Sequence, residues 1–199
     1  MAMQYGQAAI HARLDAIETS IGVSAKVQIR SGAAPATPAT ADSGTLLCEM
    51  TLPVDYLNAA SAGTKTKLGT WSGTGAAAGN AGHFRIKDSA ATVTGIQGSV
   101  GVSVPLTTSA LTAANGNVLT FAATTGVVVG MNVSGTGILA NTTVIAVTGT
   151  TVTLSTSSTA GVANAAAITF AYDMPIDNVV IAVSQPVTVN SFTLTGGNT

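Results

Sequence analysis

The residues best suited to nucleophilic or metal chemistry are few: one cysteine, Cys48, and two histidines, His11 and His83. A nucleophilic thiol needs a base held beside it, and no motif ties either histidine to Cys48. Cys48 alternates with Leu46 and Met50 along the chain, which is the spacing of residues on one face of a strand. We therefore interpret Cys48 as a small buried hydrophobic residue.

His83 belongs to a short segment in which apolar and polar residues alternate. Phe84 and Ile86 fall on one face of the expected strand, and His83, Arg85 and Lys87 fall on the other. A metal site would need further ligands at a matching spacing, and the sequence does not display them. We expect this polar face to be solvated or to contact another protein.

Two carboxylates, Asp173 and Asp177, stand four positions apart and could in principle serve acid–base chemistry or bind Ca²⁺. Their neighbours Pro175 and Asn178 favour turns instead. The glycine-rich segment 73–79 lacks the Lys-Ser/Thr of a phosphate loop and the strand-then-helix context of a dinucleotide site. The sequence therefore predicts no catalytic residue, no cofactor site and no metal site, and a protein that is not an enzyme.

The number and placement of charged residues exclude several further classes of protein. Charged residues make up 8% of the chain, with 7 Lys+Arg against 8 Asp+Glu, far below the usual share of about 25%. No Asp, Glu, Lys, Arg or His occurs from Ser89 to Tyr172. So few cations argue against binding nucleic acid, and one cysteine excludes an internal disulfide. Frequent Thr, Gly and Ser interrupt every apolar run, so no membrane span is expected.

Residues 4–21 carry the one clear helical pattern, with Ile10, Leu14, Ile17 and Ile21 on one face. We expect residues 1–22 to form an N-terminal helical arm that either packs on its own sheet or docks on a neighbouring subunit. His11, on this helix, is expected to be a surface contact. The start of the chain shows no basic region followed by an apolar run, so secretion by the usual route is not predicted.

The remainder reads as strands and turns. In the outer part, residues 23–105 and 171–199, strands are predicted at 23–30, 46–52, 66–71, 83–87 and 92–104. Loops are predicted at 31–43 and 73–82. A terminal hairpin is predicted from strands 178–183 and 186–194, with a bulge at 190–191.

The middle block, residues 106–170, consists of short uncharged segments separated by turn residues, and we interpret it as an insertion into the outer domain. Asn115-Gly116 is a strong hairpin signal. Short strands are expected at 118–122, 131–133, 143–147, 151–154 and 167–172. Their spacing is typical of a small β-sandwich or barrel.

Four outer segments resemble a family of tailed-bacteriophage virion proteins: AASAGTKT (59–66), GNAGHFRIKDS (79–89), IQGSVG (96–101) and DNVVIAVSQPVTVNSFTLTGGN (177–198). In similar sequences the segment like 98–101 runs almost directly into the one like 177–178, which supports the insertion. The middle block, with GVVVGMNVSGTGI (126–138), looks like a Thr/Gly/Val-rich module of phage surface and tail proteins.

The resemblance implies a mainly β, jelly-roll-like antiparallel sandwich with an N-terminal helix, acting as a capsid cement or decoration protein. Such a protein is made in the host cytoplasm, sits on the phage head surface, bridges major capsid subunits and associates with itself as a dimer or trimer. The helix and the loop 31–43 are the candidate contact arms, and the uncharged insert is the candidate outward-facing or oligomerising domain. No cofactor, nucleic acid or membrane is implied.

Two alternative functions are also compared with the sequence. A tail, head-fibre or receptor-facing protein would use the Thr/Gly-rich module as an adhesive tip. A glycan-active enzyme or lectin would ordinarily need carboxylate pairs and exposed aromatics, and one Trp, three Tyr and eight acidic residues argue against it.

Overall fold

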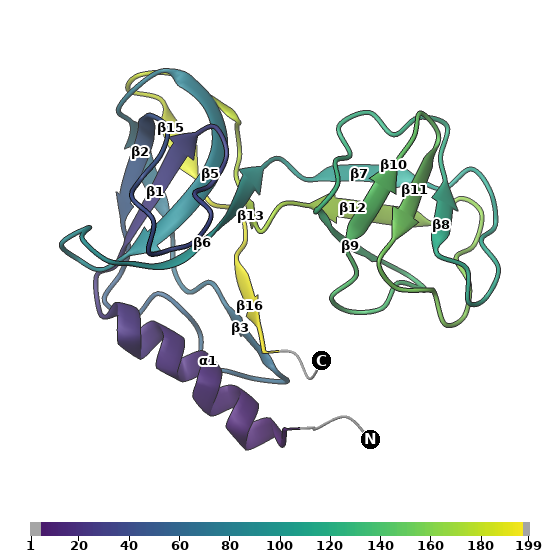
Figure 1. The fold of residues 1–199 in the computed structure, drawn as a ribbon, viewed down its shortest axis with the longest axis horizontal. Coiled ribbons are helices and arrows are strands. Elements are labelled where there is room, and N and C mark those ends of the chain that lie inside the picture. Colours follow the sequence, from purple (N-terminus) through teal and green to yellow (C-terminus); the bar gives the residue numbers. More distant parts are fainter. Residues whose placement is uncertain (1–4, 197–199) are drawn as a thin grey trace. The chain divides into compact units, whose positions relative to one another are not determined.

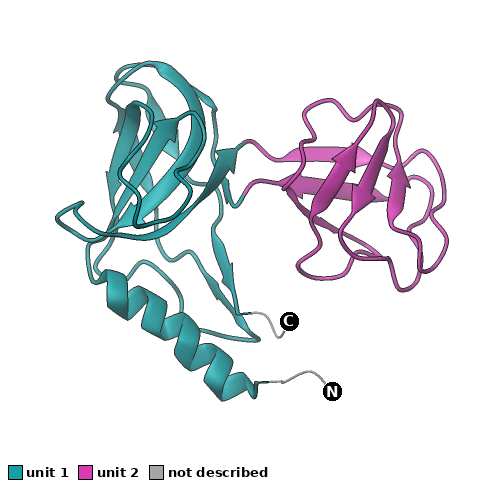
Figure 2. Ribbon diagram, in the orientation of Figure 1, with its two compact units in different colours: residues 1–101, 173–199 teal, residues 102–172 magenta. Residues whose placement is uncertain are grey.

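The computed structural model describes residues 5–196 and divides the chain into two compact units. The first unit comprises residues 1–101 and 173–199, and the second unit comprises residues 102–172 (Figure 2). The second unit begins a few residues earlier than the predicted insert, at 102 instead of 106. The reason is that strand β7 (Val104–Thr107) pairs with β12 (Ala167–Ala171) of the second unit.

The N-terminal helix α1 spans Gln7–Ile21, which confirms the helix predicted from the apolar spacing; residues 1–4 lie outside the described part. Gly22 follows the last helical residue, and its φ of +88° lies in a region that favours glycine. Ile10, Leu14 and Ile21 are buried, and Ile21 belongs to the core of the first unit. The apolar face of α1 therefore packs on its own unit, which is the first of the two predicted alternatives.

A charge clamp joins α1 to strand β3 (Thr64–Thr66). The Lys65 ammonium lies 2.6 Å from the Asp15 carboxylate and 2.7 Å from that of Glu18. Burial alone would lower the pKa of Lys65, but bonds to the two carboxylates outweigh it and raise that pKa. His11 Nε2 also accepts a bond from the Gly63 N–H, so the predicted surface residue holds the helix to a loop.

The first unit is built on a curled sheet with the order β13-β6-β5-β1-β2-β4-β15, and β14 pairs with the start of β5 (Figure 1). All pairs are antiparallel except β13 with β6. A separate pair joins β3 to β16. The strands are β1 Lys26–Ser31, β2 Leu46–Thr51, β4 Ser72–Gly75, β5 Gly79–Lys87, β6 Thr94–Gly101, β13 Met174–Pro175, β14 Val180–Ile181, β15 Pro186–Thr188 and β16 Thr193–Thr195.

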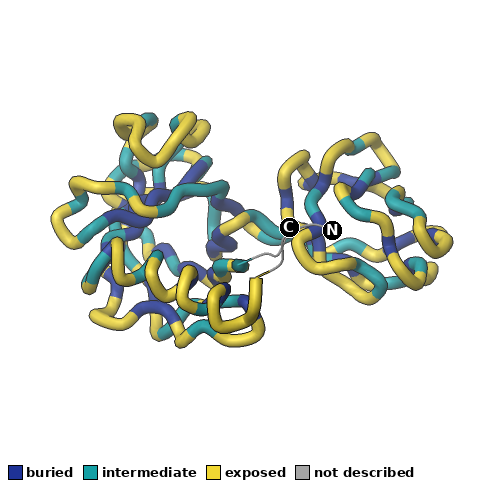
Figure 3. The backbone as a smooth tube through the Cα atoms, turned by 60° about the horizontal axis from the view of Figure 1, so that its bottom comes forward, coloured by how far each residue is buried: buried dark blue, intermediate teal, exposed yellow. Residues whose placement is uncertain are grey.

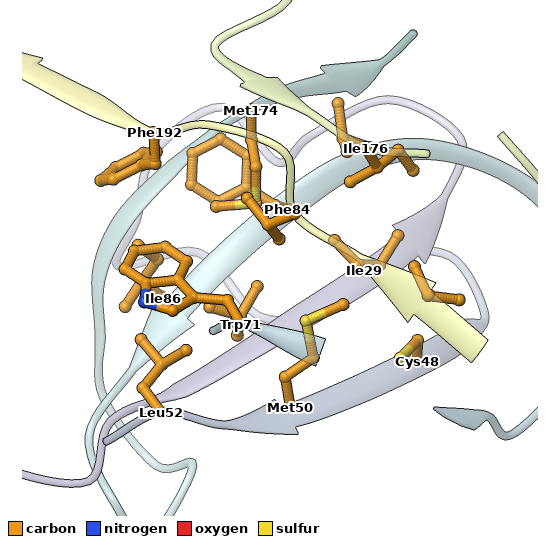
Figure 4. Close-up of a cluster of buried hydrophobic side chains, with 14 of the residues drawn as sticks. Ile29, Cys48, Met50, Leu52, Trp71, Phe84, Ile86, Met174, Ile176 and Phe192 are labelled. Atoms are coloured by element: carbon orange, nitrogen blue, oxygen red, sulfur yellow. The ribbon is translucent and has the colours of Figure 1, made fainter. Parts of the chain in front are cut away.

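The inner face of this sheet carries the hydrophobic core (Figure 4). Trp71 is fully buried; its ring centroid lies 5.4 Å from that of Phe192 and 6.1 Å from that of Tyr56. Phe84 meets Phe192 edge to face at 5.8 Å. Such aromatic packing adds to the burial of area, so this cluster anchors the C-terminal segment to β5.

The second unit is barrel-like and consists of two three-stranded sheets. One sheet has the order β7-β12-β9 and the other β10-β11-β8. The bridges Thr108–Phe121 and Asn132–Thr143 join these sheets edge to edge on both sides. The strands not yet bounded are β8 Val118–Thr120, β9 Asn132–Gly135, β10 Val144–Val147 and β11 Thr151–Leu154.

The mainly-β, antiparallel fold with one N-terminal helix is thus confirmed, but several local predictions are wrong. Residues 66–71 were expected to form a strand but are largely irregular. Residues 73–82 were expected to form a loop but supply most of β4 and the start of β5. The terminal hairpin does not form, because β14 pairs with β5, β15 with β4 and β16 with β3. Asn115-Gly116 makes a turn, but β8 beyond it pairs with β11.

Burial follows this architecture: the strands of both units carry the buried positions, and most connecting loops are exposed (Figure 3). Among the described residues, no helix has the length and apolar character needed to cross a membrane.

Candidate functional site

The outer face of the central strands is almost entirely polar. Pairing of β1 with β5 sets Lys26 opposite Lys87, Gln28 opposite Arg85 and Arg30 opposite His83. Opposed residues of a pair share one face of a sheet, and this face is the one opposite Phe84 and Ile86. We refer to these six residues as the basic face.

The β5 side of the basic face is buried, which corrects the prediction that His83, Arg85 and Lys87 are solvated or contact another protein. His83 is 0% exposed, Arg85 1% and Lys87 5%. The covering segment is the connection from β1 to β2, residues 32–45, and its contacts with the face are hydrogen bonds and ion pairs. We call residues 32–45 the cover loop.

Asp42 in the cover loop is the centre of these contacts. Its Oδ1 lies 2.6 Å from the Arg85 guanidinium, and its Oδ2 lies 2.9 Å from that of Arg30 and 2.8 Å from the Lys87 ammonium. One carboxylate thus binds three cations of two adjacent strands. Its own side chain is 26% exposed, whereas the three cations are 1–12% exposed.

Backbone carbonyls of the cover loop accept hydrogen bonds from other N–H groups of the two arginines. Arg85 Nη2 donates to Pro38 O at 2.5 Å and to Thr40 O at 2.9 Å. Arg30 Nη1 donates to Gly44 O at 3.1 Å. Because a carbonyl carries only a partial charge, these bonds orient the guanidinium groups without neutralising them.

On the β2 side of the face, the charge of Lys26 is balanced by Glu49. Lys26 Nζ lies 2.7 Å from Glu49 Oε1, and Gln28 Nε2 donates to Glu49 Oε2 at 2.9 Å. The hydrogen bond from Lys26, against a smaller effect of burial, lowers the pKa of Glu49.

Three buried polar atoms under the cover loop have no hydrogen-bond partner: His83 Nε2, Arg85 Nε and Gln97 Oε1. Arg85 and Gln97 are opposed residues of β5 and β6. His83 Nδ1 lies 3.0 Å from Gly32 O, and since a carbonyl only accepts, Nδ1 carries the proton and a neutral ring leaves Nε2 as an acceptor.

The cover loop is expected to weaken in acid. Burial of Asp42 favours its neutral form, but the hydrogen bond from Lys87 and the charges of Arg30 and Arg85 outweigh burial, so the pKa of Asp42 lies below its ordinary value of 3.8. The stabilisation is therefore complete above the ordinary pKa and is lost as the pH falls through the lower folded-state value. Urea midpoints of the first unit should fall below about pH 4, and less so in Asp42→Asn; equal acid sensitivity of both proteins would contradict this role.

Gly44 lets the cover loop close onto β1. Its φ is +67°, and a Cβ there would lie 1.9 Å from Ser31 O. The change Gly44→Ala should destabilise the first unit by about 1–2 kcal/mol from the left-handed backbone alone, seen as a lower urea midpoint by Trp71 fluorescence. Gly32→Ala, at a φ of +73° with no atom near its Cβ, separates the backbone effect from the collision. Equal midpoints for the two variants would show that the close approach is unimportant.

An open pocket of about 670 Å³ lies beside this network. Arg85, Lys87 and Asp42 contribute to its lining, together with residues 37–41 of the cover loop and residues 92–94, where the turn after β5 enters β6. Asp88 closes that turn by accepting bonds from Thr92 N and Oγ1, both at 2.7 Å.

The other residues considered from the sequence take part in the packing and hydrogen bonding of the first unit. Cys48 is buried and free, and burial, with smaller effects of Asp177 and Glu49, raises the pKa of its thiol to about 11. Asp173 accepts bonds from Ser99 N and Oγ, and Asp177 accepts one from Thr188 N. Within the described part of the chain, no three His, Cys, Asp or Glu side chains gather in a way that could hold a metal ion.

No protein-family model, curated protein or solved structure matches this chain.

Proposed function

We propose that this protein is a bacteriophage virion structural protein, a cement or decoration protein that binds the outside of the head and bridges major capsid subunits. The resemblance of segments 59–66, 79–89, 96–101 and 177–198 to phage virion proteins carries the proposal. In the structure these segments include β3, β5, β6, β14, β15 and β16, and so most of the scaffold of the first unit.

The character of the surface supports a structural role. Most cations of the first unit are held in internal ion pairs, and the second unit has no charged residue at all. Large aliphatic side chains are exposed on both units, among them Val54, Val93, Leu111, Val129 and Ile145. Permanent interfaces are depleted of charge and enriched in apolar area, so such surfaces suit lasting contacts with other subunits.

In this role the protein adds contact area across the joints of the shell. A stable attachment needs about 800 Å² on each partner, and the pressure inside the head must then break these contacts as well as those of the shell. The cover loop is fixed by ion pairs to the sheet beneath it, so it can hold one shape without a partner.

Counting copies per particle tests this proposal. Quantitative gels of purified virions should show a copy number comparable with that of the major capsid protein. A copy number of about a dozen or fewer, as at a single portal or tail axis, would contradict the cement role and favour a tail or fibre protein.

A further inference from the structure

The network under the cover loop has more positive than negative charge. Arg30, Arg85 and Lys87 meet the single carboxylate of Asp42. Asp88 also stands at this end of β5, but its oxygens accept bonds from the turn at Thr92 and Val93. Even with Asp88 and the neighbouring Lys26–Glu49 pair included, four cations face three carboxylates, and buried charges are ordinarily paired.

The unused donors belong to the same side chains. Arg85 is 1% exposed, and its buried Nε has no hydrogen-bond partner. Lys87 has three N–H groups and two acceptors, Asp42 Oδ2 and, at 3.3 Å, Ala91 O. The network can therefore accept further negative charge without losing its present bonds.

The pocket beside the network has a suitable lining. Arg85 and Lys87 provide the cationic part of the lining. The Thr92 hydroxyl already donates to Asp88, and the hydroxyls of Thr37 and Thr40 bond each other, so Thr94 and one of that pair can donate to a ligand. The Asp42 carboxylate also lines the pocket, where its charge is offset by its three cationic partners. The rest of the lining is aliphatic, from Pro38, Ala39, Ala41 and Val93. A cationic base, hydroxyl donors and an aliphatic rim together suit an oxyanion.

We propose that this pocket binds an oxyanion, either a carboxylate or a tetrahedral phosphate or sulfate. The anion would lie between the cover loop and residues 92–94 at the start of β6, beside Arg85 and Lys87, and would compensate the excess cation charge. It would also tie the loop to these residues, so binding stabilises the first unit. This site does not depend on the proposed role in a virion.

The test is saturable stabilisation of the full chain. Trp71, the one tryptophan, lies in the first core, so its fluorescence follows unfolding of the first unit alone. Sodium phosphate, sodium sulfate or sodium acetate is titrated against sodium chloride at equal ionic strength. At about ten times its Kd, a bound anion should raise the Tm of the first unit by about 3–6 °C.

The second unit is an internal control for general salt effects. Excluded salts such as sulfate stabilise any folded domain, and they would raise both transitions without saturation. A specific site raises only the Trp71 transition, and the shift reaches a plateau. Saturation by phosphate or sulfate alone indicates a tetrahedral anion, whereas saturation by acetate indicates a carboxylate such as an acidic side chain; either result supports the site.

Matched variants locate the effect. Lys87→Gln should weaken binding at least tenfold, because it removes an ionic donor. Lys67→Gln, at a lysine outside the pocket whose Nζ donates to Gly69 O, should bind as the native chain does. If Lys87→Gln does not fold, amide NMR shifts of the native chain decide: saturable shifts at residues 40–42 and 92–94 support the site. Absence of saturable shifts and of a Tm plateau with all three anions overturns it.

Discussion

Replacing Asp42 with asparagine is expected to destabilise the first unit by about 2–4 kcal/mol. Removing one partner of a buried ion pair costs about 3–5 kcal/mol, and the partial exposure of Asp42 reduces that value. Asparagine has the same shape, so the change removes charge and leaves three cations without their carboxylate. Urea unfolding followed by Trp71 fluorescence measures the loss.

The matched control is Asp55→Asn, at an exposed carboxylate of the same unit, which should change stability by less than about 0.5 kcal/mol. Subtilisin should also cleave the cover loop of Asp42→Asn faster than that of the native chain, because the loop loses its ionic contacts. Equal unfolding midpoints for Asp42→Asn and Asp55→Asn would show that Asp42 does not hold the loop.

Truncating Phe170 to alanine should destabilise the second unit by about 3–5 kcal/mol and leave the first unit unchanged. Phe170 is fully buried and meets Phe121 edge to face at 5.6 Å, so the truncation leaves a cavity in a small core. Far-UV circular dichroism should show part of the signal lost at lower urea concentration. The Trp71 transition should keep its midpoint, because the two cores are separate.

Val129→Ala is the control, since Val129 is 63% exposed on the second unit and should have little effect on either transition. If Phe170→Ala moves the Trp71 midpoint as far as the circular dichroism midpoint, the two units unfold together and the division into independent cores is wrong.

The sequence predicts the fold well where a repeated apolar pattern is long. The spacing of Ile10, Leu14, Ile17 and Ile21 identifies α1, and alternation identifies the cores of β1, β2 and β5. Strands of two or three residues, such as β14 and β15, carry too little pattern to reveal a partner. The turn at Ser184 therefore predicts a hairpin, although the two flanking strands pair with β5 and β4 instead.

The burial of the basic face under the cover loop does not follow from the strand pattern alone. Alternation places His83, Arg85 and Lys87 on one face of β5 but does not reveal what covers that face. The answer is Asp42, an acidic residue in an irregular Pro/Ala/Thr-rich segment. One signal in the sequence points to this contact. Several cations on neighbouring strands need a carboxylate if they are buried, and Asp42 is the acidic residue in the connection from β1 to β2.

The proposed role in the virion is tested most directly by adding the purified chain to phage heads that lack it. The cement role predicts saturable binding to heads, at a fixed ratio to the major capsid protein, and a higher temperature of genome release from the decorated heads. Binding to isolated tails but not to heads, or binding to heads without any change in their thermal stability, would contradict it.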